Sequence, residues 1–181
     1  VCMASAGVTL FVGVAMAFAS NTGGAKLNIR QAFVMTTLSW VFLTIFAAIP
    51  LYYSEMELSY TDAFFEAMSG LTTTGSTVIT GLDYAPPGIL LWRALLQWIG
   101  GIGIIVMAIA ILPLLRVGGM QLFRMESSEQ GDKALPRAAQ VAAVIGVIYL
   151  VLTLIWSAAY WFAGMSGFDS IAHAMTTIAT G

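Results

Sequence analysis

The sequence has little charge and only one cysteine. Lysine, arginine, aspartate and glutamate make up 9% of the 181 residues, whereas a soluble domain carries about 25%. So little polar surface cannot cover a core of this size, and we expect lipid to cover it. Cys2 alone excludes an internal disulfide and a cysteine-rich metal site. The net charge of -2 provides no broad basic surface, so nucleic acid is not an expected partner.

Motifs typical of enzymes are also missing. The sequence has no serine–histidine pair, His-Glu metal motif, membrane-embedded acidic pair or phosphate-binding loop of the Walker type. We therefore predict no catalytic residue and no cofactor. An intramembrane enzyme and a membrane scaffold remain the alternatives from other classes of function.

Long apolar runs dominate what is present, with 59% hydrophobic residues. Four runs reach the length of about 20 residues that a bilayer requires: Val1–Ala19, Gln31–Tyr53, Pro87–Leu115 and Ala138–Met165. They predict an all-α membrane protein. The first run begins without a charged leader, and the chain reaches Gly181 without any stop signal. We therefore expect the chain to be a fragment of a longer protein.

The basic residues predict the topology. All those outside the apolar runs fall in two connections, residues 21–30 and 116–137: Lys26, Arg30, Arg116, Arg124, Lys133 and Arg137. Residues 54–86 and 166–181 contain acidic residues but no lysine or arginine. The positive-inside rule therefore assigns the first two connections to the cytoplasm and the other two to the outside.

A repeat with an offset of 107 residues relates the two halves of the chain. Polar pairs such as Arg30/Arg137, Ser59/Ser166 and Asp62/Asp169 match in the same order. A one-residue deletion in the second copy then pairs Thr74–Gly75 with Thr180–Gly181. Both copies enter from the predicted cytoplasmic side, so the repeat is parallel.

Each copy contains a short amphipathic helix after its span. Ser59-x-x-Asp62 and Ser166-x-x-Asp169 are capping boxes, which mark helix starts. A helix over residues 60–71 is about 18 Å long, little more than half of the ~30 Å hydrocarbon core. Such a helix cannot cross, and non-helical backbone after it is tolerated only beside protein or a water-filled cavity. The pattern predicts re-entrant pore loops.

The segment after the first short helix, residues 70–77, is rich in threonine and glycine. Backbone carbonyls replace the hydration shell of a cation without adding fixed charge. Gly75 permits the backbone angles that direct successive carbonyls to one axis, and threonine favours an extended strand. Taken alone, this composition is also typical of a surface loop, but the repeat and the half-length helix favour an ion filter.

Three segments resemble a known family. Residues 62–75 (DAFFEAMSGLTTTG), 91–103 (LWRALLQWIGGIG) and 173–181 (HAMTTIATG) are similar to the Trk-type membrane subunit of bacterial potassium uptake systems. The resemblance implies a potassium-channel-like fold in which four span–pore-loop–span units, following a helical hairpin, surround one pore. Its implied divisions are the end of the hairpin (1–20), a cytoplasmic loop (21–30), the first unit (31–115), a cytoplasmic connection (116–137) and a second unit truncated at its filter (138–181).

The resemblance also implies the filter residues and the ion. The first filter strand would be Thr73, Thr74, Gly75 and Ser76, and the second Ala179, Thr180 and Gly181, with potassium as the only metal. Gly75 favours potassium, because serine at this position accompanies sodium preference in some plant relatives; a sodium-permeable transporter of the same fold is the alternative. Ile178–Ala179 replaces Thr72–Thr73 in the second copy, which carbonyl coordination tolerates.

The family's partners are implied in the same way. Its members form homodimers in the bacterial inner membrane, cross the bilayer several times and bind a cytoplasmic nucleotide-binding regulatory subunit. We therefore expect the bilayer, a second copy and such a subunit as partners.

Four further features have competing interpretations. Arg93 is expected inside the third span, where a charge is normally paired, and Glu66 is its predicted structural partner. The alternatives are that Arg93 acts as a charge near the pore mouth and that Glu66 lines the ion entrance. Gly100, Gly101 and Gly103 predict close helix packing, with a gating hinge as the alternative. His173 occupies the repeat position of Glu66, and packing or a hydrogen bond is favoured over metal binding.

Overall fold

The structure, a computed structural model, describes residues 7, 9–15, 29–115 and 134–180. Within these residues it is helical and has no strand, as the sequence predicts. The principal helices are α2 (Ile29–Tyr52), α3 (Tyr60–Leu71), α4 (Pro87–Leu115), α6 (Ala134–Phe162) and α7 (Gly167–Ile178), and a 3-10 helix, η1, covers Leu82–Tyr84.

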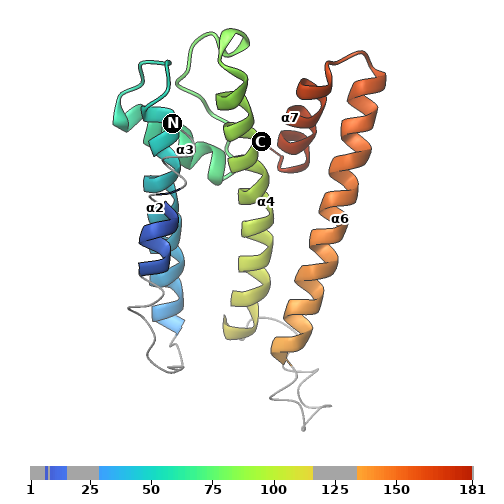
Figure 1. Cartoon of the computed structure of the whole chain (residues 1–181). Coiled ribbons are helices and arrows are strands. Elements are labelled where there is room, and N and C mark those ends of the chain that lie inside the picture. The colour runs from blue at the N-terminus through green and yellow to red at the C-terminus, as the bar shows by residue number, and fades with distance from the viewer. Residues whose placement is uncertain (1–6, 8, 16–28, 116–133, 181) are drawn as a thin grey trace.

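Three helices are long and apolar enough to cross a bilayer. Their candidate spans are Phe33–Tyr52, Pro87–Met107 and Gln140–Phe162. Figure 1 shows α2, α4 and α6 side by side, with the start of α2, the end of α4 and the start of α6 at the same end of the molecule. Many apolar side chains on α6 are exposed, including Leu154 at 69%, which fits a lipid or protein environment around this helix.

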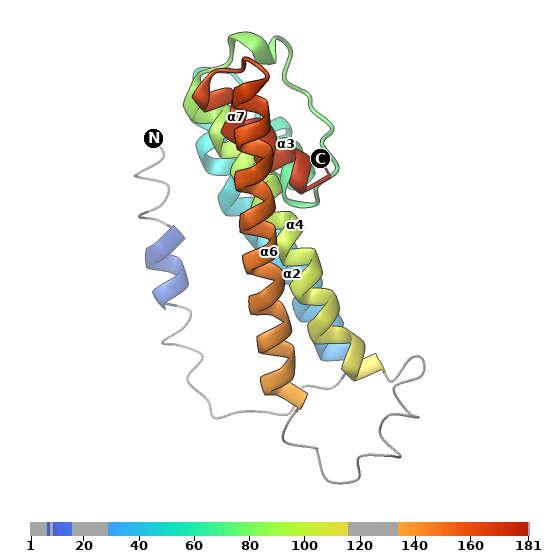
Figure 2. The ribbon, with the colours of Figure 1, turned by 90° about the vertical axis from the view of Figure 1, so that its right-hand side faces the viewer.

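The helices α3 and α7 are both half-length, as predicted. Each has 12 residues, or about 18 Å at 1.5 Å per residue. The predicted serine caps the start of each helix. The Ser59 hydroxyl accepts a hydrogen bond from the Asp62 N–H, and the Ser166 hydroxyl accepts one from the Asp169 N–H, both at 3.1 Å. Figures 1 and 2 show that both short helices lie beside the same half of the long helices.

The repeat holds in three dimensions without a gap. Both ends of α3 and α7 differ by 107 residues. Beyond them, Thr73 and Thr180 share a positive φ, 57° and 60°. The backbone thus pairs Thr180 with Thr73, whereas the alignment with a one-residue deletion pairs it with Thr74. The predicted deletion is therefore wrong as far as Thr180. It was placed to pair identical residues, whereas the equal lengths of α3 and α7 leave no residue missing.

Two predicted boundaries move by a few residues. Helix α2 begins at Ile29, inside the expected loop 21–30, and α6 begins at Ala134, inside the expected connection 116–137. Pro136 does not prevent this start, because the first turn of a helix needs no hydrogen bond from its N–H groups. Lys26, Arg116, Arg124, Lys133 and most of the run Val1–Ala19 lie outside the described residues.

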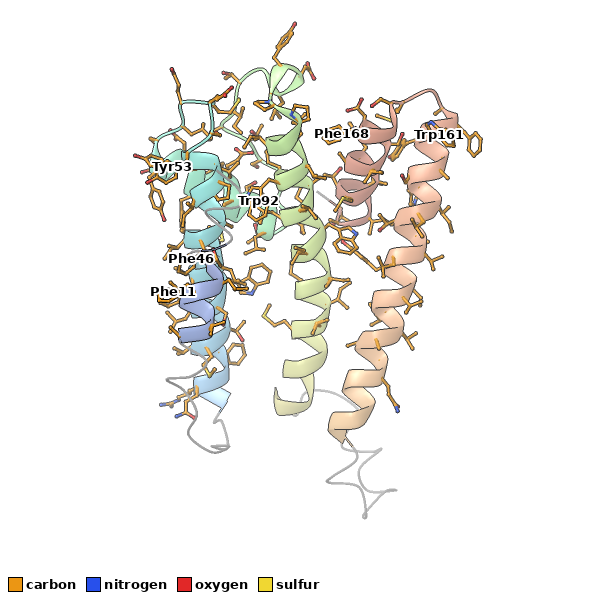
Figure 3. All side chains as sticks on the ribbon, in the orientation of Figure 1. Phe11, Phe46, Tyr53, Trp92, Trp161 and Phe168 are labelled. Carbon is orange, nitrogen blue, oxygen red and sulfur yellow. The ribbon has the colours of Figure 1, made fainter. Side chains whose placement is uncertain are left out.

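Small residues hold α3 between α2 and α4. Trp92 lies between the two long helices (Figure 3), and its indole N–H donates to the Ala47 carbonyl at 3.0 Å. Alanines allow the helix backbones to approach closely. The buried core of this unit consists of Ala47, Ala48, Leu51, Ala63, Ala67, Ile89 and Leu96. Helix α7 packs in the equivalent way against α6 and also contacts α4.

Candidate functional site

The first loop leaves α3 through a tight turn. The N–H groups of Thr73 and Thr74 donate to the carbonyls of Gly70 and Ser69, at 3.0 and 2.9 Å. Both Thr73 and Gly75 have positive φ, 57° and 75°. The predicted filter segment is therefore not extended throughout. A left-handed conformation is costly for a branched residue such as threonine, and the turn hydrogen bonds hold Thr73 in it.

Three carbonyls of this loop have no hydrogen bond within the described part of the chain: those of Thr73, Thr74 and Gly75. The Ser76 carbonyl differs, because it accepts a hydrogen bond from the Ser69 hydroxyl at 2.5 Å. The hydroxyls of Thr72 and Thr74 contact each other at 2.9 Å. Thr73, Thr74 and Gly75 thus have free carbonyl oxygens in succession, whereas Ser76 uses part of its capacity to hold the loop.

Glu66 holds the end of this loop. Its side chain is fully buried, and Oε1 lies 2.5 Å from Arg93 Nε. Oε2 accepts hydrogen bonds from Thr77 Oγ1 and the Val78 N–H, both at 3.0 Å. One carboxylate therefore links α3, α4 and the segment that follows the predicted filter strand. The predicted contact between Glu66 and Arg93 is present.

Two neighbouring glycines of α4 contact the ends of the two short helices. A methyl group at Gly100 would overlap the carbonyl of Leu71, the last residue of α3. A methyl group at Gly101 would lie 2.5 Å from the Tyr149 hydroxyl and 3.3 Å from the Cα of Ala179, which caps α7. The predicted close packing is therefore present at Gly100 and Gly101, whereas a methyl group at Gly103 would make only an ordinary contact with Trp40 at 3.8 Å. Both helix C-termini consequently reach α4 at the same level.

The second loop begins like the first but lacks its carboxylate. Ala179 caps α7, and the Thr180 N–H donates to the Thr177 carbonyl at 3.1 Å. His173, at the repeat position of Glu66, is exposed, and its Nδ1 contacts the Asp169 carbonyl of its own helix at 2.9 Å. Gly181, the last predicted filter residue, lies outside the described residues.

The electrostatics at this end of the molecule favour a cation. The negative ends of the α3 and α7 dipoles, each equivalent to about half a charge, meet beside Gly100 and Gly101. Acidic residues lie at this end of the molecule: Glu55, Glu57 and Asp83 in the connections, and Asp62 and Asp169 in the first turns of α3 and α7. Among the described residues, no group of three or more His, Cys, Asp or Glu side chains is arranged to hold a metal ion. Carbonyl oxygens are the available ligands.

Sequence reasoning missed the residues that hold the loop from behind. Ser69, Thr77 and Val78 form hydrogen bonds around the predicted filter strand. Ser69 follows Glu66 by three residues, so both lie on one face of α3. A polar face on an otherwise apolar half-length helix was the signal that could have identified Ser69. The return of Thr77 and Val78 to that face is a tertiary contact that no local pattern indicates.

Comparisons with known proteins agree on one family. The model of the cation transport protein family TrkH matches residues 1–181. The Trk system potassium uptake protein TrkI of Halomonas elongata is 51% identical over 151 residues, which are 83% of this chain and 31% of that protein. The Trk system potassium uptake protein TrkH of Escherichia coli K12 is 46% identical over 177 residues, or 96% of this chain and 37% of that protein.

A solved structure is similar as well. The crystal structure of the potassium transporter TrkH from Vibrio parahaemolyticus matches with a TM-score of 0.80 and 39% sequence identity, over 96% of this chain and 34% of that one. The chain thus spans about a third of the length of these relatives.

Proposed function

Because this chain belongs to the TrkH family of cation transport proteins, we propose that it contributes two filter loops to a pathway for potassium uptake across the bacterial inner membrane. The family implies four such loops around one pore, and the chain contains the loops after α3 and α7. The printed names of the relatives, which are potassium uptake proteins, support potassium as the ion.

In this proposal, a potassium ion loses water at the loops and binds carbonyl oxygens instead. Thr73, Thr74 and Gly75 supply free carbonyls from the first loop. The predicted second set is Ala179, Thr180 and Gly181, in which Thr180 has the backbone position of Thr73. Ser76 contributes with the lone pair that Ser69 leaves free. Carbonyl dipoles bind a monovalent cation strongly enough to replace water, yet weakly enough to release it. The short helices add negative potential at the same level.

The observation that carries the proposal is the meeting of two equivalent half-length helices on one helix. Leu71 is the last residue of α3 and Ala179 caps α7. They contact the neighbouring residues Gly100 and Gly101. A single surface loop with many threonines has no reason to recur at the same level 107 residues later. Two such ends are what a pore built from repeated units requires.

A sodium-permeable pathway of the same fold is the second candidate. Gly75, with φ 75°, argues against it. Without a side chain, this residue directs its carbonyl as the turn requires, whereas serine there would alter the spacing of the ligands. An intramembrane enzyme or a scaffold is disfavoured, because the family is one of transport proteins.

We further propose the partners that the family implies. These are the lipid bilayer, a second copy of the protein and a cytoplasmic nucleotide-binding regulatory subunit. The end of the molecule with the starts of α2 and α6 and the end of α4 is the cytoplasmic one, on the charge pattern of the connections. It is therefore the side on which the regulatory subunit would bind.

The test is uptake by the full-length protein in a bacterial strain without its own potassium uptake systems. We expect growth at low external potassium and uptake of potassium in clear preference to sodium, measured by ion content over time. Equal uptake of both ions would favour the sodium-permeable alternative. If neither ion enters, with the protein and its regulatory subunit present in the membrane, the transport proposal fails.

A further inference from the structure

Tyr149 is the one buried residue among the described side chains of α6, residues 140–162. Its exposure is 7%, whereas its neighbours Ile148 and Leu150 are 52% and 49% exposed. A buried tyrosine hydroxyl needs a hydrogen-bond partner, and that of Tyr149 donates to the Trp98 carbonyl of α4 at 3.1 Å. The hydroxyl therefore connects α6 to α4.

A second hydroxyl takes part in the same contact. Thr153 lies one turn beyond Tyr149 on α6, and its Oγ1 accepts a hydrogen bond from the Trp98 indole N–H at 3.0 Å. The same hydroxyl donates to the Tyr149 carbonyl at 2.7 Å. The ring centroids of Trp98 and Tyr149 are 5.5 Å apart. Trp98 is thus bound to α6 through its ring and through its carbonyl.

The repeat indicates that these hydroxyls serve this contact. The residues 107 positions before Tyr149 and Thr153 are Phe42 and Phe46, which carry no polar group. The pattern that the two spans share therefore does not require a hydroxyl at either position. The two hydroxyls occur in the span that binds Trp98.

The Tyr149 hydroxyl also lies beside the end of α7. A methyl group at Gly101 would be 2.5 Å from this hydroxyl and 3.3 Å from both Cα and Cβ of Ala179. The hydroxyl and the cap of α7 therefore adjoin the same small space on α4. Helix α7 lies between α4 and α6 and contacts both (Figure 1). The second loop begins at this point.

The two loops differ in what holds them. The first is bound from behind by Glu66, whereas His173 at the repeat position is exposed and contacts only its own helix among the described residues. Helix α7 is instead tied to α6, because the hydroxyls of Tyr160 and Thr177 contact each other at 2.9 Å. The position of the second loop on α4 therefore depends on how α6 is fixed to α4, which is the contact that Tyr149 makes.

We propose that Tyr149 is a positioning residue for the second filter loop. Its hydroxyl fixes α6 and α7 together against α4, so that Ala179 stays in contact with Gly101. This inference rests on the proposed ion pathway. Tyr149 touches no ion and acts through the place where α7 ends.

The first test compares Tyr149→Phe with Tyr84→Phe in the full-length protein. Both changes remove only a hydroxyl. We expect Tyr149→Phe to lower the ratio of potassium to sodium uptake about fivefold, the factor that one hydrogen bond contributes to an equilibrium. Tyr84 is 93% exposed, so its variant should retain the wild-type ratio. A Tyr149→Phe protein that is less stable but keeps the wild-type ratio would show a purely structural contact and overturn the proposal.

Hydrogen exchange measures the positioning without reference to transport. The N–H groups of Ala179 and Thr180 are hydrogen-bonded at the end of α7, as those of Thr73 and Thr74 are at the end of α3. We expect Tyr149→Phe to accelerate exchange severalfold at the first pair and to leave the second pair unchanged. No change at Ala179 and Thr180, or an equal change in both loops, overturns the proposal.

Gly101→Ala provides a variant that retains the tyrosine. The added methyl group should displace the Tyr149 hydroxyl from the Trp98 carbonyl and lower the uptake ratio as Tyr149→Phe does. In the Tyr149→Phe background it has no hydroxyl to displace, so it should lower the melting temperature less than in the wild type. An unchanged ratio in Gly101→Ala, or equal shifts of the melting temperature in the two backgrounds, overturns the proposal. Failure of the wild type to transport either ion would instead refute the ion pathway, and hydrogen exchange would still decide whether Tyr149 positions the loop.

Discussion

Glu66, which is fully buried, and Arg93, which is partly buried, form an ion pair with Oε1 and Nε 2.5 Å apart. The carboxylate also binds Thr77 and Val78 through its other oxygen. The pair therefore does more than neutralise a charge inside a spanning helix. It connects α3, α4 and the end of the loop at one point.

Removal of one partner should be costly. We expect Arg93→Met to lower the stability by about 3–5 kcal/mol, because it leaves Glu66 as an unpaired buried carboxylate. Glu66→Gln added to this variant should restore part of the loss, since a neutral amide needs no counter-charge. The thermal unfolding of both single variants and the double variant in detergent measures this coupling. Strictly additive effects would argue against a coupled pair.

Gly75→Ser should reduce the discrimination between potassium and sodium. Serine in the left-handed conformation costs about 1–2 kcal/mol, and its relaxation would turn the neighbouring carbonyls. Gly81 provides the matched control, because it has the same φ of 75° outside the predicted filter. Gly81→Ser should cause similar strain with a wild-type uptake ratio. Equal ratios in the two variants would show that Gly75 is not a filter residue.

Gly100→Ala should separate α3 from α4. The added methyl group would overlap the Leu71 carbonyl, which belongs to backbone and cannot rotate away. We expect a loss of stability of at least the ~1–3 kcal/mol typical of overpacking, together with reduced uptake. Gly88→Ala in the same helix meets no atom within 4 Å and should be close to neutral. A stable, active Gly100→Ala protein would contradict the observed packing.

Ser69→Ala should release the Ser76 carbonyl. The lost hydrogen bond, 2.5 Å long, is worth about 1 kcal/mol, and the loop beyond Gly75 should become more mobile. Faster hydrogen exchange at residues 76–78 is the expected result. Ser39→Ala is the control, since this hydroxyl binds only the Met35 carbonyl of its own helix. If exchange in the loop does not change, Ser69 has no role in holding it.

Local chemistry made much of this fold predictable. Ser59 and Ser166 are helix caps, and capping depends on a few neighbouring residues, so both half-length helices could be located from the sequence. The pairing of Glu66 with Arg93 was also predictable, because a spanning helix rarely contains an unpaired charge. The three long helices follow from their apolar length alone.

Tertiary geometry set the rest. The positive φ of Thr73 opposes the preference of a branched residue, and only the turn around Ser69 and Gly70 explains it. The pairing of Thr180 with Thr73 depends on equal helix lengths, which sequence identity did not reveal. Gln97 Oε1 is buried without a hydrogen-bond partner among the described residues. Such an atom can be identified only when the surroundings of its side chain are known.

The adjacency of Gly100 and Gly101 has a mechanical consequence. The ends of α3 and α7 contact consecutive residues of one helix, α4. A movement of α4 along its axis therefore displaces both contacts by the same distance. A rotation of α4, by contrast, moves both Gly100 and Gly101 away from the helix ends that they contact. A movement at only one of the two contacts must therefore originate in α3 or α7. A force on the far end of α4 acts on both contacts at once.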